Sequence, residues 1–133
     1  MKVDMINPKS INRPSGYTHG VVVEGGRIFF IAGQVAWDEH GKCVAPGDIV
    51  KQFRQVLKNL KACCDEVDCK MTDLVKLNVY VTDKADYMAH NAELHAIWLE
   101  YFGKFFPPLT LVEITKLWDD ENIVEIEGIA ILK

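Results

Sequence analysis

The 133-residue sequence lacks the features that would assign it to several broad classes of protein. It has no basic excess, because 15 Lys and Arg stand against 19 Asp and Glu and give a formal net charge of −4. Nucleic-acid-binding proteins present a basic surface, so the charge argues against nucleic acid as a partner. No apolar run approaches the roughly 18 residues of a membrane-spanning helix. No apolar signal-peptide segment follows Met1 either, so we expect no membrane association and a cytoplasmic location.

The motifs of nucleotide, serine-hydrolase and metal sites are also missing. No G-x-G-x-x-G, P-loop or G-x-S-x-G pattern occurs, and His90 and His95 stand five residues apart, which does not fit the H-E-x-x-H spacing. The four cysteines lack the paired C-x-x-C spacing of structural zinc sites, so we expect reduced thiols that pack as small hydrophobes. They are Cys43, Cys63, Cys64 and Cys69. The sequence therefore predicts no metal and no cofactor.

What is present fits one globular domain that spans residues 1–133, with 49% hydrophobic and 26% charged residues. A first amphipathic helix is predicted to begin after the N-cap Asp48 and to extend to about Val67. A second is predicted to begin after the N-cap Asp86 and to end near Phe102. Its expected inward stripe consists of Met88, Asn91, His95, Trp98 and Phe102. Asn91, the amide in this stripe, is either satisfied by backbone groups or lines a pocket.

The remaining apolar segments predict strands. Residues 17–23 and 28–32 are expected to form a hairpin around Gly25 and Gly26, and residues 74–81 form a further strand. Two closing strands, residues 107–114 and 124–131, are expected to pair. The run 28–32 is wholly apolar, which predicts a strand covered on both faces.

The order of these elements favours an α+β domain with both helices on one face of a mixed sheet. The other face still carries apolar residues. Burial against copies of the same chain would cover it.

Two carboxylates are the clearest candidates for chemistry. Glu125 and Glu127 share one face of a strand, roughly 7 Å apart, because side chains alternate with period two. Neighbouring carboxylates can have pKa values that are pushed apart, which suits one of them for acid or base catalysis. The alternative is a pair of ordinary solvent-facing glutamates.

A family resemblance covers almost the whole chain, from residue 6 to residue 131. The segments that carry it include Ile31-Ala32-Gly33-Gln34, Gln52 to Leu60, Phe106-Pro107, Val112-Glu113 and Val124 to Ala130. The chain resembles the Rid family (YjgF/YER057c/UK114), enamine and imine deaminases also known as endoribonuclease L-PSP. The resemblance implies a chorismate-mutase-like fold, with a mixed six-stranded sheet and two helices on one face. It also implies a homotrimer around a central barrel, with ligand sites in the clefts between subunits.

The resemblance also implies roles for individual residues. Glu125 would position the attacking water and Tyr17 would help to orient the substrate. The other pocket positions that match are Ala32, Gly33, Gln34 and Asn91. Three positions depart from the family pattern: Leu109 replaces the arginine that clamps the substrate carboxylate, Ala32 replaces a serine, and Leu111 replaces a cysteine. Because leucine offers no bidentate partner for a carboxylate, the expected pocket is more apolar than that of an archetypal imine deaminase.

Three functions stay open at this point. The first is hydrolytic deamination of a small imine or enamine by Glu125, with a substrate other than a simple 2-imino acid, or with Lys116 or another cation in place of the arginine. The second is a non-catalytic trimer that binds a small metabolite. The third, an endoribonuclease or translation inhibitor, fits poorly with the acidic charge and with the absence of a histidine pair.

Overall fold

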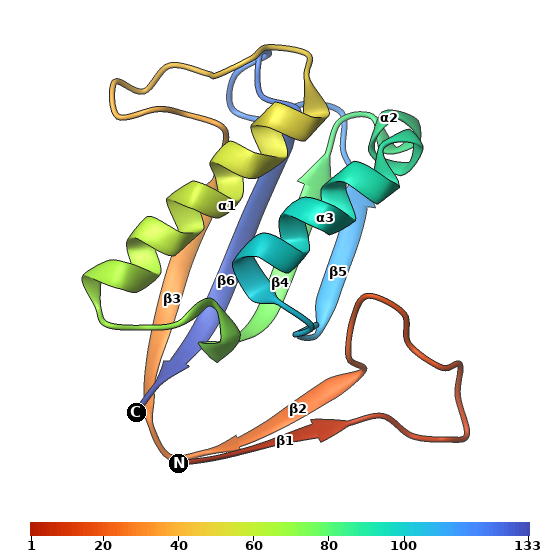
Figure 1. Cartoon of the computed structure of the whole chain (residues 1–133), viewed down its shortest axis with the longest axis vertical. Helices are drawn as coiled ribbons and strands as arrows, with labels where there is room; N and C mark the ends of the chain where they lie inside the picture. Colours follow the sequence, from red (N-terminus) through yellow and green to blue (C-terminus); the bar gives the residue numbers. More distant parts are fainter.

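The structure is a computed structural model that describes residues 1–133. Its centre is a mixed sheet of four strands in the order β3-β6-β4-β5 (Figure 1). These strands are β3 (Arg27–Gln34), β4 (Leu74–Val81), β5 (Leu109–Glu113) and β6 (Val124–Leu132). β4 and β5 run parallel, whereas β6 is antiparallel to both of its neighbours. β1 (Lys2–Ile6) and β2 (Gly20–Glu24) form a separate antiparallel pair.

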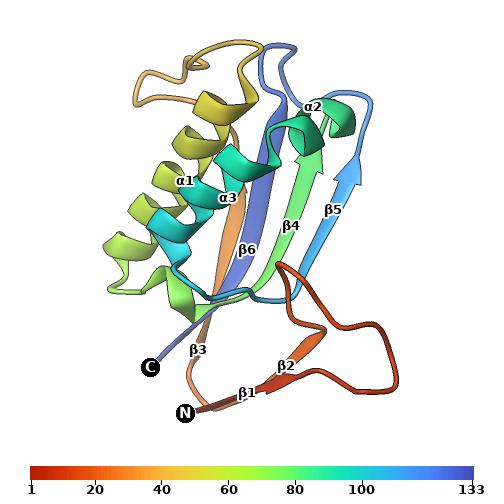
Figure 2. The ribbon, with the colours of Figure 1, turned by 45° about the vertical axis from the view of Figure 1, so that its right-hand side comes forward.

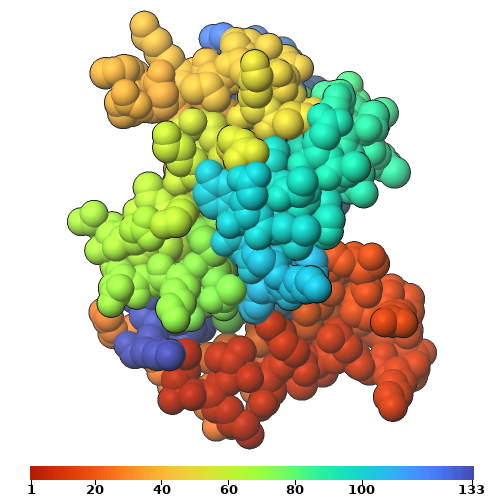
Figure 3. Space-filling view, viewed as in Figure 1, coloured from red at the N-terminus to blue at the C-terminus, as the bar shows by residue number.

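Two main helices cover one face of the central sheet. They are α1 (Ile49–Glu66) and α3 (Asn91–Phe102), with the short α2 (Lys84–Ala89) and the 3-10 turn η1 (Met71–Asp73) beside them. Both ribbon views show α1 and α3 side by side in front of the sheet (Figures 1 and 2). The space-filling view shows their side chains closed over its centre (Figure 3). The predicted α+β architecture is therefore confirmed, and none of these helices is long and apolar enough to cross a membrane.

The first helix forms as the sequence predicts. Asp48 is its N-cap, and the side chain accepts a hydrogen bond of 3.0 Å from the backbone N–H of Lys51. The apolar residues recur at helical spacing and point to the sheet. The residues of α1 that are buried are Ile49, Gln52, Phe53, Val56, Leu57, Leu60 and Cys64.

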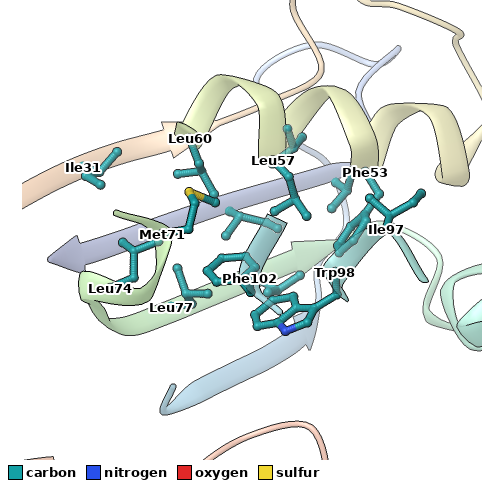
Figure 4. Close-up of a cluster of buried hydrophobic side chains, with 14 of the residues drawn as sticks. Ile31, Phe53, Leu57, Leu60, Met71, Leu74, Leu77, Ile97, Trp98 and Phe102 are labelled. Atoms are coloured by element: carbon teal, nitrogen blue, oxygen red, sulfur yellow. The ribbon is translucent and has the colours of Figure 1, made fainter. Parts of the chain in front are cut away.

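The core lies between the helices and the near face of the sheet (Figure 4). Period-two alternation assigns each strand residue to one face. On β6, Val124, Ile126 and Ala130 are fully buried beneath the helices, whereas Glu125 and Glu127 point to the other face and are half-buried. Only the helix-covered face is thus closed within one chain.

The strand pairing differs from the prediction in two places. Residues 20–24 and 27–34 do not form a hairpin, because β2 pairs with β1 and β3 pairs with β6. Gly25 and Gly26, both with positive φ, connect the two sheets instead. The closing strands β5 and β6 do not pair either, because β4 lies between them. The six strands are therefore present, divided into a pair and a four-stranded sheet.

The second helical segment also begins and folds differently. Its N-cap is Asp83, whose side chain accepts a hydrogen bond of 3.0 Å from the N–H of Asp86, and the helix breaks at His90. The break turns α3 so that Leu94, Ile97, Trp98 and Phe102 are buried. Met88, Asn91 and His95 are exposed, so the predicted inward stripe is wrong for these three residues.

β3 is not covered on both faces within the chain. Ile31 is buried under the helices, but Ile28 and Phe30 on the opposite face are 60% and 70% exposed. The prediction of a doubly covered strand is therefore wrong for the single chain. The uncovered side of the central sheet, called the open face below, carries these side chains together with those of Lys76, Asn78, Tyr80, Glu125, Glu127 and Ile129.

Candidate functional site

The carboxyl group of Glu125 lies directly over the backbone of Gly33. A Cβ atom built on Gly33 would be 2.8 Å from Cδ and 2.9 Å from Oε2 of Glu125. The register of β3 against β6 shifts between Ile31 and Gln34, so this approach occurs at an irregularity of the strand pair. Glycine leaves room for the carboxyl group here, because a side chain at this position would displace it.

Glu127, two residues further along β6, has two hydrogen-bond donors. The hydroxyl of Tyr80 donates to Oε1 at 2.6 Å, and the amide of Asn78 donates to the same oxygen at 3.1 Å. Both donors come from β4, the neighbouring strand. Sequence reasoning missed Asn78 and Tyr80, although the alternation of polar residues at 76, 78 and 80 with buried leucine and valine could have indicated them.

The two carboxylates have opposite pKa shifts. Burial raises the pKa of Glu125, and the charge of Glu127 raises it further. The hydrogen bonds from Tyr80 and then Asn78 lower the pKa of Glu127. Of the two groups, Glu125 is therefore suited to take up a proton and Glu127 to remain ionised, which agrees with the expected separation of the pair.

A hollow of about 290 Å³ lies on the open face beside Glu127, and Glu125 is not part of its lining. Its polar lining consists of Lys76, Asn78 and Glu127, and its apolar lining includes Phe30, Ala32 and Ile129. Of the predicted substrate-binding residues, Ala32 lies in this wall, and the side-chain amide of Gln34 donates to the Ala32 carbonyl at 3.2 Å. Ala32, Gly33, Gln34 and Glu125 thus form one group at the junction of β3 and β6.

A larger hollow of about 850 Å³ contains none of the predicted site residues. It lies between the end of α1, η1 and the last residues of the chain, with Lys61, Asp65 and Tyr101 among its lining. Lys61 and Asp65 form an ion pair of 2.7 Å with each other. The open-face group is the better candidate because it combines a half-buried carboxyl group with donors from a second strand.

Leu109 and Leu111 do not face Glu125. In the parallel pairing of β4 and β5 they are opposite the buried residues Leu77 and Val79, so they point to the helix-covered face. Both are half-buried against the core. The side chains of β5 that reach the open face are those of Thr110 and Val112. The position where the family has an arginine is therefore at the far edge of the sheet from β3.

Tyr17 lies near the β5 edge of the sheet. Its ring contacts His19 edge-to-face at 5.3 Å between centroids, and its hydroxyl accepts a hydrogen bond of 2.8 Å from Asn12. The next residue, Thr18, donates through its hydroxyl to the carbonyl of Phe106 at 2.5 Å, which fixes this loop to the segment before β5. Figures 1 and 2 show the loop beside the start of β5, whereas β6 begins at the opposite end of the sheet. Asn91 is exposed on the helix layer.

The predicted site residues thus fall into separate groups within one chain. No three acidic, cysteine or histidine side chains are placed to bind one metal ion. Glu125 has the Gly33 turn beside it, but Tyr17 and Leu109 lie across the sheet. A single chain does not bring these residues to one ligand.

The sequence matches relatives over nearly its whole length. It is 33% identical over 127 residues to a RutC family protein of Pyrococcus horikoshii, with 96% of each chain covered. It is 35% identical over 115 residues to the 2-iminobutanoate/2-iminopropanoate deaminase of Escherichia coli K12, with 86% of each covered.

Solved structures agree with this. A conserved Rid-family protein of unknown function from Yersinia pestis, YyfB, superposes with a TM-score of 0.87 at 33% identity, over 99% of this chain and 100% of that one. The YjgF gene product of Escherichia coli gives a TM-score of 0.70 at 33% identity, over 88% of each chain. The sequence profile described as Endoribonuclease L-PSP matches residues 8–132, and the chain therefore belongs to the Rid (YjgF) family.

Proposed function

We propose that the chain is a hydrolase that deaminates a small imine or enamine, with Glu125 as the catalytic acid and base. The observation that carries the proposal is the half-buried Glu125 carboxyl group above Gly33, whose pKa is raised by burial. Relatives of similar length named 2-iminobutanoate/2-iminopropanoate deaminase support the reaction class.

The reaction needs a group that moves protons in both directions. Water adds to the carbon of the protonated C=N bond, which an enamine reaches by protonation at carbon, while Glu125 takes one of the water protons and a neutral carbinolamine forms. Glu125 returns that proton to the amino nitrogen. The C–N bond then breaks as the hydroxyl of the intermediate gives its own proton to the Glu125 carboxylate and ammonia leaves. The products are a carbonyl compound and ammonia, so atoms balance without a redox step. A carboxyl group with a raised pKa suits this exchange, because acid–base catalysis is most efficient when the pKa lies near the working pH.

We propose further that the site is completed between copies of the chain in a homotrimer, with the open faces turned toward a central barrel. Two features support this assembly. Tyr17 and Leu109 lie at the β5 edge and Glu125 lies toward the β3 edge, so a neighbouring copy is needed to bring both edges to one ligand. The open face also exposes Phe30 and Ile28, which a neighbour would remove from water.

The apolar side chain at position 109 defines the substrate class that we propose. Leu109 offers no hydrogen-bond donor and packs against the core, so it does not bind a carboxylate. We therefore propose an imine or enamine that is uncharged at this end, in preference to a 2-imino acid. A cation elsewhere, such as Lys116 in the loop after β5, is the alternative if carboxylated substrates react.

The experiment compares imines with and without a carboxylate. An amino-acid oxidase generates 2-imino acids in situ, an amine oxidase generates uncharged imines, and ammonia release is followed for the wild type, Glu125→Gln and Leu109→Arg. The control Glu113→Gln makes the same charge change on another strand of the sheet. We expect the wild type to accelerate hydrolysis of the uncharged imines, Glu125→Gln to lose at least about a hundredfold, and Leu109→Arg to gain activity on 2-imino acids.

The same experiment distinguishes the hydrolase from a second candidate, a non-catalytic trimer that binds a small metabolite. The apolar side chain of Leu109 favours this second candidate. Equal hydrolysis with wild type, Glu125→Gln and no protein, for both classes of imine, would reject the hydrolase. Activity on 2-imino acids alone would reject the proposed substrate class and retain the reaction.

A further inference from the structure

We propose that Glu127 is a positioning residue for Glu125. Tyr80 and Asn78 hold the Glu127 carboxylate in place, and the fixed negative charge of Glu127 keeps Glu125 ready to accept a proton. The chemical meaning of this inference rests on the proposed function, but the coupling between the two carboxylates can be measured independently of it. Sequence reasoning gave Glu127 no role, and the resemblance to the Rid family gives it none.

The contacts of Glu127 are specific and come from a single neighbouring strand. Asn78 is the direct cross-strand partner of Glu127, and Tyr80 is the partner of Glu125. The Tyr80 hydroxyl nevertheless reaches Oε1 of Glu127, at 2.6 Å, so its ring leans from the level of one carboxylate to that of the other. Together with the 3.1 Å bond from Asn78, this fixes both the position and the ionised form of Glu127.

The geometry brings this fixed charge close to Glu125. Residues i and i+2 of a strand are separated by roughly 7 Å and point to the same face. Glu125 itself accepts no hydrogen bond within the chain, and Gly33 beneath it offers only backbone. Its ionisation is therefore governed by burial and by the charge of Glu127.

The other groups around the two carboxylates do not replace this charge. β3 contributes Ala32, Gly33 and Gln34 at this level, none of which is ionisable. β4 contributes Tyr80 and, further along, Lys76, whose ammonium donates to the Thr110 hydroxyl at 3.1 Å. Lys76 also lines the hollow beside Glu127. Glu127 is thus the one anionic group that faces Glu125 from its own strand or from the neighbouring ones.

A division of labour follows from the two environments. The carboxylate with two donors stays charged and does not exchange protons, whereas the carboxyl group without donors becomes the stronger base. Removal of the charge at 127 should make Glu125 a weaker base without altering its position above Gly33. A merely structural role of Glu127 would change stability but would not move the titration of Glu125.

The experiment is a carboxylate ¹³C NMR titration of the intact protein labelled at glutamate. It uses the wild type, Glu127→Gln, Tyr80→Phe and the control Glu113→Gln, in which the same charge is removed from β5, opposite the buried Val81. In Glu127→Gln we expect Glu125 to titrate at lower pH than in the wild type. In Tyr80→Phe we expect Glu127 to titrate at higher pH, and in Glu113→Gln we expect Glu125 to titrate as in the wild type.

The acidic limb of the kcat/KM profile with an uncharged imine supplies the second measurement, and it should move to lower pH in Glu127→Gln. An unchanged titration of Glu125 in Glu127→Gln would overturn the inference, as would an equal shift in Glu113→Gln. If the NMR titration shifts as expected but the wild type hydrolyses no imine, the coupling stands and the proposed function fails. The two failures are therefore distinguishable.

Discussion

The two faces of the central sheet are built from alternate residues of the same strands, yet they differ in how far the chain buries them. On the helix-covered face, Leu77, Val79 and Ile126 are almost fully buried among other apolar side chains (Figure 4). On the open face, Tyr80 and Glu127 are half-buried and hydrogen-bonded to each other, although an exposed Phe30 lies on the same face. The open face is therefore organised by its own contacts but lacks a cover.

This difference separates the residues that hold the fold from those that we propose to carry function. Exposing a large aromatic side chain to water is unfavourable, and burying two carboxylates in an apolar core is also unfavourable. The open face has both, which is the composition expected of a surface that meets a partner and a polar ligand.

Truncation on the covered face should have the largest effect. Ile126→Ala leaves a cavity under α1 and α3 and should lower the free energy of unfolding by about 2–5 kcal/mol. Ile129→Ala removes the same atoms from the open face of the same strand, where the residue is only half-buried, and should cost less. Urea unfolding at the lowest measurable protein concentration compares the two. Equal losses would contradict the division between the faces.

A charge on the open face should break assembly without unfolding the chain. Burial of the Phe30 side chain between copies would stabilise the assembly by about 1.5–3 kcal/mol for each copy. Phe30→Glu removes this contribution and places a charge in an apolar interface. Sedimentation equilibrium at micromolar concentration should give a trimer for the wild type and single chains for Phe30→Glu. The control Leu99→Glu places the same charge on the helix layer, where Leu99 is 38% exposed, and should remain trimeric. A monomeric wild type would reject the proposed assembly.

Local sequence patterns predicted much of this fold. α1, its N-cap Asp48 and the strand 74–81 were predicted correctly because helical and strand periodicity and capping depend on residues near in sequence. Strand partners depend on contacts between distant segments. The sequence therefore did not show that β1 takes β2 as its partner or that β4 separates β5 from β6. Asp83 and Asp86 are both of the residue type that caps helices, and the structure places the N-cap at Asp83.

The candidate site shows the same limit. Glu125 and Glu127 share a face, as period-two alternation predicts, but the sequence does not tell which of the two has hydrogen-bond donors. That depends on the register of β6 against β4, which brings Asn78 and Tyr80 to Glu127. The inward position predicted for Asn91 was wrong because the break at His90 rotates the helix. The roles of Tyr17, Leu109 and Leu111 stay predictions, since a single chain does not bring these residues to Glu125.

A methyl group at Gly33 should separate activity from stability. The atoms that Gly33→Ala would displace belong to the end of the flexible Glu125 side chain, so the free energy of unfolding should change by less than about 1 kcal/mol. Imine hydrolysis should fall at least about tenfold, a loss of about 1.4 kcal/mol in transition-state stabilisation, because Glu125 is moved.

Gly20→Ala is the matched control in another strand. A Cβ atom there meets only Ile6 Cβ, at an ordinary 3.8 Å. Retained activity in Gly33→Ala, or equal losses in the two variants, would show that the position of Glu125 over Gly33 has no bearing on the reaction.

The smallest effects expected are on the pH dependence of stability, and they should have opposite signs for the two glutamates. The folded-state pKa of Glu125 is raised, so its ionised form destabilises the fold at neutral pH and this penalty disappears as the pH falls through that pKa. Glu125→Gln should therefore be more stable than the wild type at pH 7 and equal to it below about pH 4, the ordinary range of a glutamate.

Glu127 provides the opposite case, because its folded-state pKa is lowered by Tyr80 and Asn78. Its ionised form stabilises the fold above the ordinary glutamate pKa, and this contribution is lost as the pH falls through the lower folded-state value. Glu127→Gln should therefore be less stable than the wild type at pH 7, with the difference closing only in more acidic solution. Thermal melts of both variants from pH 3 to pH 8 test this, and differences of the same sign would mean that the two carboxylates do not have the distinct environments on which the site depends.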